Sequence, residues 1–463
     1  MRRPTPLPAL AAVTLAATLA GCSGAGTTPA ASTATPTAEA TTATGDDDGA
    51  ALVEVATLDP RIVMTYDGGI MTLDTGSGEI LDDVELPGYL RVNAAGDGRH
   101  VLITTAEGFH AYDGALLAEA HGDHAHYRAG DPRLTDLVLP AEEAGHVVVH
   151  AGRTALFADG TGEVQVLDPT ELADGEPHVD TWTAPDAAHH GVAVALSDGT
   201  LFSSAGDDDG RYGAVVLDAD GNEITGSDDC PGLHGEAVAA GEAVVVGCEN
   251  GPLLLSGGAF SKVPVEDAYA RSGNLVGHET SAVVLGDYKT DPEADLERPE
   301  RIALIDTATG TLRLVDLGAS YSFRSLARGP QGEAFVLATD GTLRVINPDT
   351  GEELARALIV APWEEPLEWQ QPRPALHVAD SIAYITEPAT NQLHAVSLST
   401  GEVVRSYDLP HTPDEITSVT GSPPPTIEAG LPGTEDAHEE EGEGHDHEGE
   451  DQGHDHEGET HDR

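Results

Sequence analysis

The feature that most constrains this chain is a short phrase repeated along it, in which apolar residues end in Asp or another polar residue before a Gly, Asp or Thr turn. Each copy follows an earlier apolar strand and turn, so each unit predicts a small antiparallel sheet. A single small sheet cannot bury its own apolar faces, but radial packing of successive sheets removes these faces from water. The repeats therefore predict an all-β protein, a β-propeller of four-stranded antiparallel blades. The phrases lie at 70–74, 109–113, 164–168, 214–218, 253–256, 302–306, 343–347 and 393–397.

The number of phrases predicts eight blades, with seven as the alternative because the first and last units are the least regular. The turns at 306–310, 347–351 and 397–401 resemble the strand-to-strand turns of YVTN or quinoprotein-type propeller repeats. No amphipathic helical pattern interrupts the units. We expect the propeller to occupy 51–420, and the segment 52–58 could close the ring by adding a strand to the last blade.

The first residues predict export. Arg2 and Arg3 are followed by an apolar stretch at 9–19 that is too short to span a bilayer. The four residues Leu-Ala-Gly-Cys that end at Cys22 resemble the lipobox of bacterial lipoproteins. We therefore expect 1–21 to be a lipoprotein signal peptide and Cys22 to carry lipid, which would anchor the protein at the outer side of the cell membrane. The alternative is an ordinary secretory signal with an incidental cysteine.

Both ends of the chain have a composition typical of disorder. The segment 22–50 is rich in Ala, Thr, Ser, Gly and Pro, and it predicts a flexible tether. The segment 421–463 begins with a proline run and continues as an acidic repeat that contains histidine, so it predicts a disordered tail. Histidines among flexible carboxylates should bind zinc weakly, because ordering the segment costs entropy. The tail histidines in question are His445, His447, His454 and His456.

A formal net charge of -59 distinguishes the whole chain. The tail explains only part of it, since 428–463 holds 15 acids and one arginine. Such a field repels nucleic acid and anionic headgroups and attracts cations. A highly acidic surface is also a general solubility device in salt-adapted organisms, so the charge alone does not identify a cation ligand. We expect a monomer that binds no nucleic acid.

Three cysteines occur in the chain. With Cys22 assigned to lipid, an oxidising setting favours a disulfide between Cys230 and Cys248. A thiolate zinc site is the rival interpretation, but the two cysteines lack the CxxC spacing of a zinc knuckle.

Histidines supply the strongest functional signal. The loop at 121–126 contains His121, Asp123, His124 and His126, four potential ligands within six residues. Elsewhere, His146, His190 and His234 recur at intervals of 44 residues.

Each of these three histidines also precedes the first turn of its blade by a comparable distance. The first strand of every propeller blade lines the channel, so equivalent positions on three neighbouring blades should converge at its mouth. His278 continues the interval but falls within a turn, so we exclude it. His150 and His189 are weaker candidates, because adjacent strand residues point to opposite faces.

Three neutral imidazoles and a carboxylate or fourth imidazole make a tetrahedral site suited to Zn²⁺, whereas Mg²⁺ and Ca²⁺ prefer oxygen ligands. Asp123, or a histidine of its loop, could close the channel site from above. Copper(II) would bind the same ligands at least as tightly, so the ligand set does not exclude it.

The phrases at 145–157, 189–193 and 230–236, with Gly247 and Cys248, resemble the AztD family of zinc metallochaperones, and the likeness extends from about 60 to 410. The resemblance implies a propeller that binds zinc outside the cytoplasm and passes it to the zinc solute-binding protein of an ABC importer. It also implies the ligands. They are His124, His126, His146, His190 and His234, with Asp123 as the acidic ligand.

Two other functional classes have less support. Zinc-dependent hydrolysis would need a positioned base, and no HExxH spacing occurs. Quinoprotein dehydrogenases would need tryptophan-rich blades, and the chain has three tryptophans. We therefore predict no enzyme activity. The remaining alternative is a lipid-anchored propeller that acts as a protein-interaction scaffold without a tight metal site.

Overall fold

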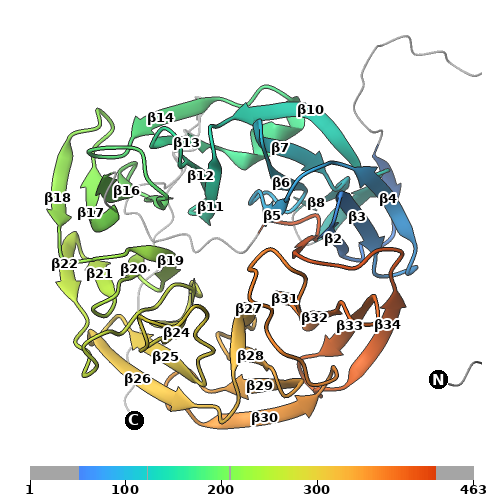
Figure 1. Ribbon diagram of the computed structural model, residues 1–463. Coiled ribbons are helices and arrows are strands. Elements are labelled where there is room, and N and C mark those ends of the chain that lie inside the picture. The colour runs from blue at the N-terminus through green and yellow to red at the C-terminus, as the bar shows by residue number, and fades with distance from the viewer. Residues whose placement is uncertain (1–51, 122–123, 208–209, 424–463) are drawn as a thin grey trace, which may run out of the picture. The chain divides into compact units, whose positions relative to one another are not determined.

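The computed structural model describes residues 52–121, 124–207 and 210–423, which form almost only β-strands. Eight four-stranded antiparallel sheets are arranged around a common axis like the blades of a propeller (Figure 1). Residues of several inner strands, such as Val92, Leu376 and Ile416, line a central channel. The predicted fold class is confirmed, and the eight sheets are consistent with eight blades. Each of the eight repeated phrases forms the third strand of its blade.

The blades are numbered 1 to 8 in chain order, and their strands are given from the channel outward. Blade 1 consists of β35 (Ile416–Val419), β2 (Arg61–Tyr66), β3 (Gly69–Asp74) and β4 (Ile80–Glu85), and blade 2 of β5 (Arg91–Ala94), β6 (His100–Thr105), β7 (Gly108–Asp113) and β10 (Arg133–Pro140). Blade 3 consists of β11 (Ala144–His150), β12 (Arg153–Ala158), β13 (Glu163–Leu167) and β14 (Val179–Thr183). Blade 4 consists of β15 (Ala193–Ala195), β16 (Leu201–Asp207), β17 (Gly210–Leu217) and β18 (Glu223–Ser227).

Blade 5 consists of β19 (His234–Ala239), β20 (Ala243–Gly247), β21 (Leu253–Ser256) and β22 (Ala259–Lys262), and blade 6 of β23 (Leu275–Val276), β24 (Val283–Asp287), β25 (Arg301–Asp306) and β26 (Thr311–Asp316). Blade 7 consists of β27 (Tyr321–Arg328), β28 (Ala334–Ala338), β29 (Thr342–Ile346) and β30 (Glu353–Leu358). Blade 8 consists of β31 (Leu376–Ala379), β32 (Ile382–Glu387), β33 (Gln392–Ser397) and β34 (Val403–Asp408).

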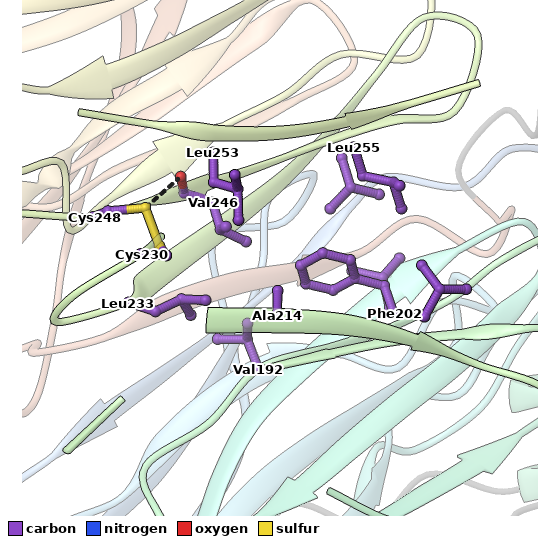
Figure 2. Packing of buried hydrophobic residues seen from close by; sticks show 12 residues of the cluster. Val192, Phe202, Ala214, Cys230, Leu233, Val246, Cys248, Leu253 and Leu255 are labelled. Atoms are coloured by element: carbon purple, nitrogen blue, oxygen red, sulfur yellow. Dashed lines mark hydrogen bonds between the residues drawn. A yellow bond between two sulfur atoms is a disulfide. The ribbon is translucent and has the colours of Figure 1, made fainter. Parts of the chain in front are cut away.

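Packing between blades explains the sequence of their middle strands. Strands such as β20 are apolar on both faces because a neighbouring blade covers each face, whereas an outer strand such as β4 alternates between exposed and partly buried residues. Figure 2 shows the cluster between blades 4 and 5, where Val246 and Leu253 lie next to the Cys230–Cys248 disulfide and Phe202 and Leu255 pack farther along the same layer. This apolar layer holds blades 4 and 5 in fixed register.

The ring closes through the C-terminal strand. β35 pairs antiparallel with β2, with Arg61 opposite Val419 and Met64 opposite Ile416. The expectation that 52–58 adds a strand to the last blade is therefore wrong. β1 (Val53–Val55) instead pairs with β9 (His124–Ala129), outside the blades, and blade 8 is complete with its own four strands.

β8 (Leu116–His121) and β9 form a hairpin inserted between the third and fourth strands of blade 2. A 3₁₀ helix, η1 (Pro169–Asp174), connects β13 to β14. Among the described residues, no helix has the length and apolar character needed to cross a bilayer.

The inner strands define two ends of the channel. We call the end where they begin the proximal mouth and the end where they turn into the second strands the distal mouth. Because successive strands are antiparallel, the third strands also end at the distal mouth. β7 ends there at Asp113, opposite His100 at the start of β6.

Candidate metal centres

Three histidines from adjacent blades meet at the proximal mouth. His146 belongs to β11, His190 to the segment before β15, and His234 to the first position of β19. Their ring centroids are 5.1 to 5.5 Å apart, and one nitrogen from each ring lies within 4.8 Å of the other two. We call these three the channel histidines. The equal spacing along the chain thus corresponds to equivalent places in three blades.

Each channel histidine is held through Nδ1. His190 Nδ1 lies 2.5 Å from Oδ2 of Asp159, and His146 Nδ1 hydrogen-bonds Oε1 of Glu236 at 3.3 Å. His234 Nδ1 lies 2.7 Å from the carbonyl oxygen of Gly273. All three partners are acceptors, so each Nδ1 carries the proton and each Nε2 presents a lone pair to the channel.

The lone pairs converge closely. Nε2 of His190 and Nε2 of His234 are 3.2 Å apart. Two acceptor nitrogens at this distance repel each other unless a cation lies between them. Two imidazole ligands in a tetrahedral zinc site, with Zn–N distances of about 2.0–2.1 Å, are about 3.3 Å apart. The nitrogens of His190 and His234 thus already have the separation of two zinc ligands, and His146 offers a third nitrogen within 4.8 Å of both.

A glycine allows His234 to reach its carbonyl partner. Gly235 has φ +75° and accompanies a register shift between His234 and Glu236. A Cβ at this position would lie 2.8 Å from the Gly273 carbonyl oxygen, the atom that accepts from His234. Glycine therefore permits the close approach that orients the ring.

Electrostatics keep part of this site ready for a cation. Burial, together with the neighbouring charge of His146, lowers the pKa of His234 well below its ordinary value, so this ring stays neutral. Burial also opposes protonation of His146, but the charge and hydrogen bond of Glu236 outweigh it and raise its pKa. A proton therefore competes with a metal more readily at His146 than at His234.

The other histidine group lies on the β8–β9 hairpin. His121 is paired with His124 across the strands, and His126 follows on β9. Their ring centroids are also 5.1 to 5.5 Å apart, and Nδ1 of His121 lies 3.4 Å from Nε2 of His126. These three, the hairpin histidines, are more exposed than the channel histidines. Asp123 lies outside the described residues.

The two groups lie at opposite ends of the propeller. The hairpin leaves blade 2 after the end of β7, at the distal mouth, where the Ala118 amide donates to the Gly421 carbonyl oxygen beyond β35. The channel histidines lie at the proximal mouth. The expectation that a histidine of the 121–126 loop closes the channel site is wrong for His121, His124 and His126, because the insertion emerges at the far end of the third strand.

The remaining predicted residues have separate places. His150 pairs with Glu242 at 2.8 Å, His189 is buried against Ser204, and His278 hydrogen-bonds within its turn. Cys230 and Cys248 are bonded to each other. Neither sulfur is therefore available to a metal. Residues outside the described ranges are Cys22, His445, His447, His454 and His456.

Sequence reasoning did not identify the residues that orient the imidazoles. Glu236 could have been found, because it lies two positions after His234 and so shares its strand face. Asp159 follows β12 on blade 3 and lies 31 positions from His190, so only the packing of blades 3 and 4 brings the two together. Nothing in the local sequence around Gly273 indicates its role.

No protein-family model matches the chain. The zinc chaperone AztD of Citrobacter koseri is 28% identical over 332 residues, which cover 70% of this chain and 75% of AztD. The crystal structure of Citrobacter koseri AztD covers 79% of this chain and 98% of its own, with a TM-score of 0.68 and 24% identity.

Apo AztD gives a TM-score of 0.68 at 23% identity over 80% of this chain and its whole length. The dihydro-heme d1 dehydrogenase NirN shares the fold alone, with a TM-score of 0.52 and 14% identity over 80% of this chain and 76% of its own. The chain is thus similar to the zinc chaperone AztD in sequence and in fold, which agrees with the histidine phrases.

Proposed function

We propose that this protein carries zinc outside the cytoplasm and hands it directly to the zinc solute-binding protein of an ABC importer. The observation that carries the proposal is the convergence of three Nε2 lone pairs at the proximal mouth, two of them 3.2 Å apart. The relationship to AztD, a zinc chaperone, supports the same function. This function is carriage of the ion and not catalysis.

Zinc would be held as cargo at two places. His146, His190 and His234 would supply three nitrogens at the proximal mouth, and His121, His124 and His126 would supply three on the hairpin, with Asp123 as a further ligand there. Nitrogen-rich sites of this kind favour zinc over Mg²⁺ and Ca²⁺. The exposed hairpin is suited to faster exchange, because water and an incoming ligand can reach it.

Metal stoichiometry tests the binding part. After dialysis, we expect wild type to retain zinc at both groups and the variant His146→Ala/His190→Ala/His234→Ala to lose one tightly bound ion. A variant that also carries His121→Ala, His124→Ala and His126→Ala should retain no tight zinc. If this variant still holds zinc as tightly as wild type, the proposal fails and the scaffold alternative remains.

Transfer is tested with zinc-loaded protein and the apo solute-binding protein of a zinc ABC importer in the presence of a competing chelator. Direct transfer predicts a rate that depends on the partner concentration and is insensitive to the chelator. A rate that falls in proportion to chelator would show release through solution and would overturn the chaperone proposal while leaving zinc binding intact.

We also propose that Cys22 anchors the protein to the outer side of the cell membrane. Metabolic labelling with a fatty acid and membrane fractionation should show a lipidated, membrane-associated protein for wild type. Cys22→Ala should abolish both properties. A Cys22→Ala protein that still partitions with membranes and carries label would contradict the anchor.

The tail histidines, His445, His447, His454 and His456, are proposed to collect zinc weakly. Deletion of 424–463 should leave the number of tightly held ions unchanged and remove only the fraction that dialysis releases. Loss of a tight ion on deletion would contradict this role.

A further inference from the structure

Exposed apolar side chains lie together on the proximal face of the propeller. Two connections between neighbouring blades cross this face, 86–90 between blades 1 and 2 and 359–375 between blades 7 and 8. Tyr89 of the first packs edge-on against Trp369 of the second, with ring centroids 4.9 Å apart. Leu367, two positions earlier, is 72% exposed, Trp369 is 49% exposed and Tyr89 is 36% exposed. We call these three side chains the apolar patch.

The connection that carries most of the apolar patch is anchored to the propeller. Buried Arg373 donates from Nη1 to Oε1 of Glu365 at 2.7 Å and from Nη2 to the carbonyl oxygen of Glu368 at 2.9 Å. The Trp363 amide donates to the carbonyl oxygen of Thr339 in blade 7 at 2.9 Å. An apolar surface that is exposed and already held in place loses little conformational entropy when a partner covers it.

A hollow beside the apolar patch offers room for a side chain of a partner. Its volume is about 350 Å³, and its lining includes Tyr66, Asp67, Tyr89, Leu90 and Pro372. Aromatic residues and the pockets between them contribute much of the affinity of protein interfaces. The hollow and the apolar patch share Tyr89, so one partner can cover both.

The apolar patch is connected to the channel. The Tyr89 hydroxyl donates to Oε1 of Glu415 at 3.2 Å and accepts from Nη2 of Arg324 at 2.9 Å. Glu415 and Arg324 line a channel cavity of about 370 Å³, whose lining also includes Asn274. The residue before Asn274 supplies the carbonyl oxygen that accepts from His234. A protein that covers the patch would therefore lie over the mouth that carries the channel histidines.

Exposed acids border the apolar patch. Asp67 lines the hollow, and Glu368 lies between Leu367 and Trp369 in the chain. Glu368 accepts from the neutral amide of Gln371 and pairs with no cation among the described residues. These carboxylates would repel a second copy of a chain with net charge -59, its own acidic tail and anionic headgroups. They favour a partner that presents Lys or Arg around an apolar side chain.

We propose that the apolar patch is the docking surface for the protein that receives zinc. An apolar side chain of that protein enters the hollow, and its Lys or Arg residues meet Asp67 and Glu368. This inference rests on the proposed function and adds where the receiving protein binds. The carrier would thus present the channel histidines and the docking surface on one face.

Zinc transfer at increasing concentrations of the apo solute-binding protein tests the inference. Leu367→Ala/Trp369→Ala should raise the partner concentration at half-maximal rate about tenfold and leave zinc affinity unchanged. Leu367→Lys places a cation at the most exposed position and should have the same effect while Trp369 stays in place. The control Leu354→Ala/Leu358→Ala removes two exposed leucines from β30 and should behave as wild type.

Salt tests the charge complementarity. Raising the salt concentration should slow transfer by wild type, because it screens the attraction between the acids and a basic partner. Asp67→Asn/Glu368→Gln should be slower at low salt and should lose most of this salt dependence. An unchanged salt dependence would contradict the role of these two acids.

Three outcomes would overturn the inference and leave the proposed function standing. The first is equal transfer by the patch variants and the control at every partner concentration. The second is a wild-type dimer that Leu367→Lys dissociates in sedimentation, which would make a second copy the occupant. The third is faster transfer after deletion of 424–463 in wild type but not in Leu367→Lys, which would make the tail the occupant. If wild type transfers no zinc directly, the proposed function fails, and the inference with it.

Discussion

His190 donates from Nδ1 to Oδ2 of Asp159 at 2.5 Å, and this contact fixes which ring nitrogen faces the channel. The charge of Asp159 also makes the imidazole a stronger donor to a cation. The pair joins blades 3 and 4, so the ligand geometry depends on the packing between them.

Replacement of this partner should weaken zinc binding without loss of the fold. We expect Asp159→Asn to lower zinc affinity at the channel histidines about tenfold, because outer-shell partners of histidine ligands typically contribute about 10–100-fold. Competition with a chromogenic chelator measures the change. Asp180→Asn, which removes an exposed acid that pairs with Arg153, is the matched control. Equal affinities for both variants would contradict an orienting role for Asp159.

The two histidine groups should bind zinc independently, because they lie at opposite mouths. We expect His124→Ala to remove the hairpin ion and to leave zinc affinity at the channel histidines within about twofold of wild type, as for sites without shared partners. His190→Ala should do the reverse. Isothermal titration of each variant checks this, and a large change at both groups from either substitution would show that they are coupled.

The disulfide should stabilise both the fold and the site. Cys248 directly follows Gly247, which pairs with His234, so the bond holds the start of β19 in place. The cysteines are 18 positions apart, for which loss of the crosslink costs about 3 kcal/mol. Cys230→Ala/Cys248→Ala should therefore lower the free energy of unfolding by about this amount and weaken zinc binding at the channel histidines.

Urea unfolding and chelator competition measure the two effects. Val244→Ala provides the control, because it removes buried volume from the same cluster and keeps the disulfide. This control should lower stability but leave zinc affinity unchanged. The role of the disulfide in positioning His234 would be contradicted by equal zinc affinities in the control and the double variant.

Partly buried His377 should make the protein sensitive to acid. Its Nε2 contacts Ser418 Oγ at 2.8 Å, and burial lowers its pKa from 6.5 to about 4. The unfolded chain therefore takes up the proton first as the pH falls. Stability is lost between pH 6.5 and about 4, by up to about 3 kcal/mol from this group.

His377→Gln can still bond Ser418 and should flatten the loss of stability across that pH interval, as measured by urea unfolding at several pH values. The exposed residue His178 provides the control, and His178→Gln should leave the slope unchanged. Identical slopes in wild type and His377→Gln would show that other groups cause the acid sensitivity.

Sequence reasoning succeeded where the structure repeats. Every third strand carries its phrase because the same packing problem recurs in every blade, and the constant interval of His146, His190 and His234 follows from that repetition. It failed where the chain departs from the repeat. The β8–β9 hairpin gives no sequence signal of which mouth it leaves, and the partnership of His190 with Asp159 depends on contacts between blades.

Because β35 closes the ring, the propeller can be completed only after the C-terminal strand has been synthesised. The first blade takes its inner strand from the last part of the propeller, so a chain that is still being made or threaded through a membrane lacks an enclosed channel. Glu415, whose carboxylate binds Arg91 and Arg324 at the proximal mouth, arrives with that same strand. The mouth that carries the channel histidines is therefore completed last, and a chain truncated before Ile416 would lack one of its walls.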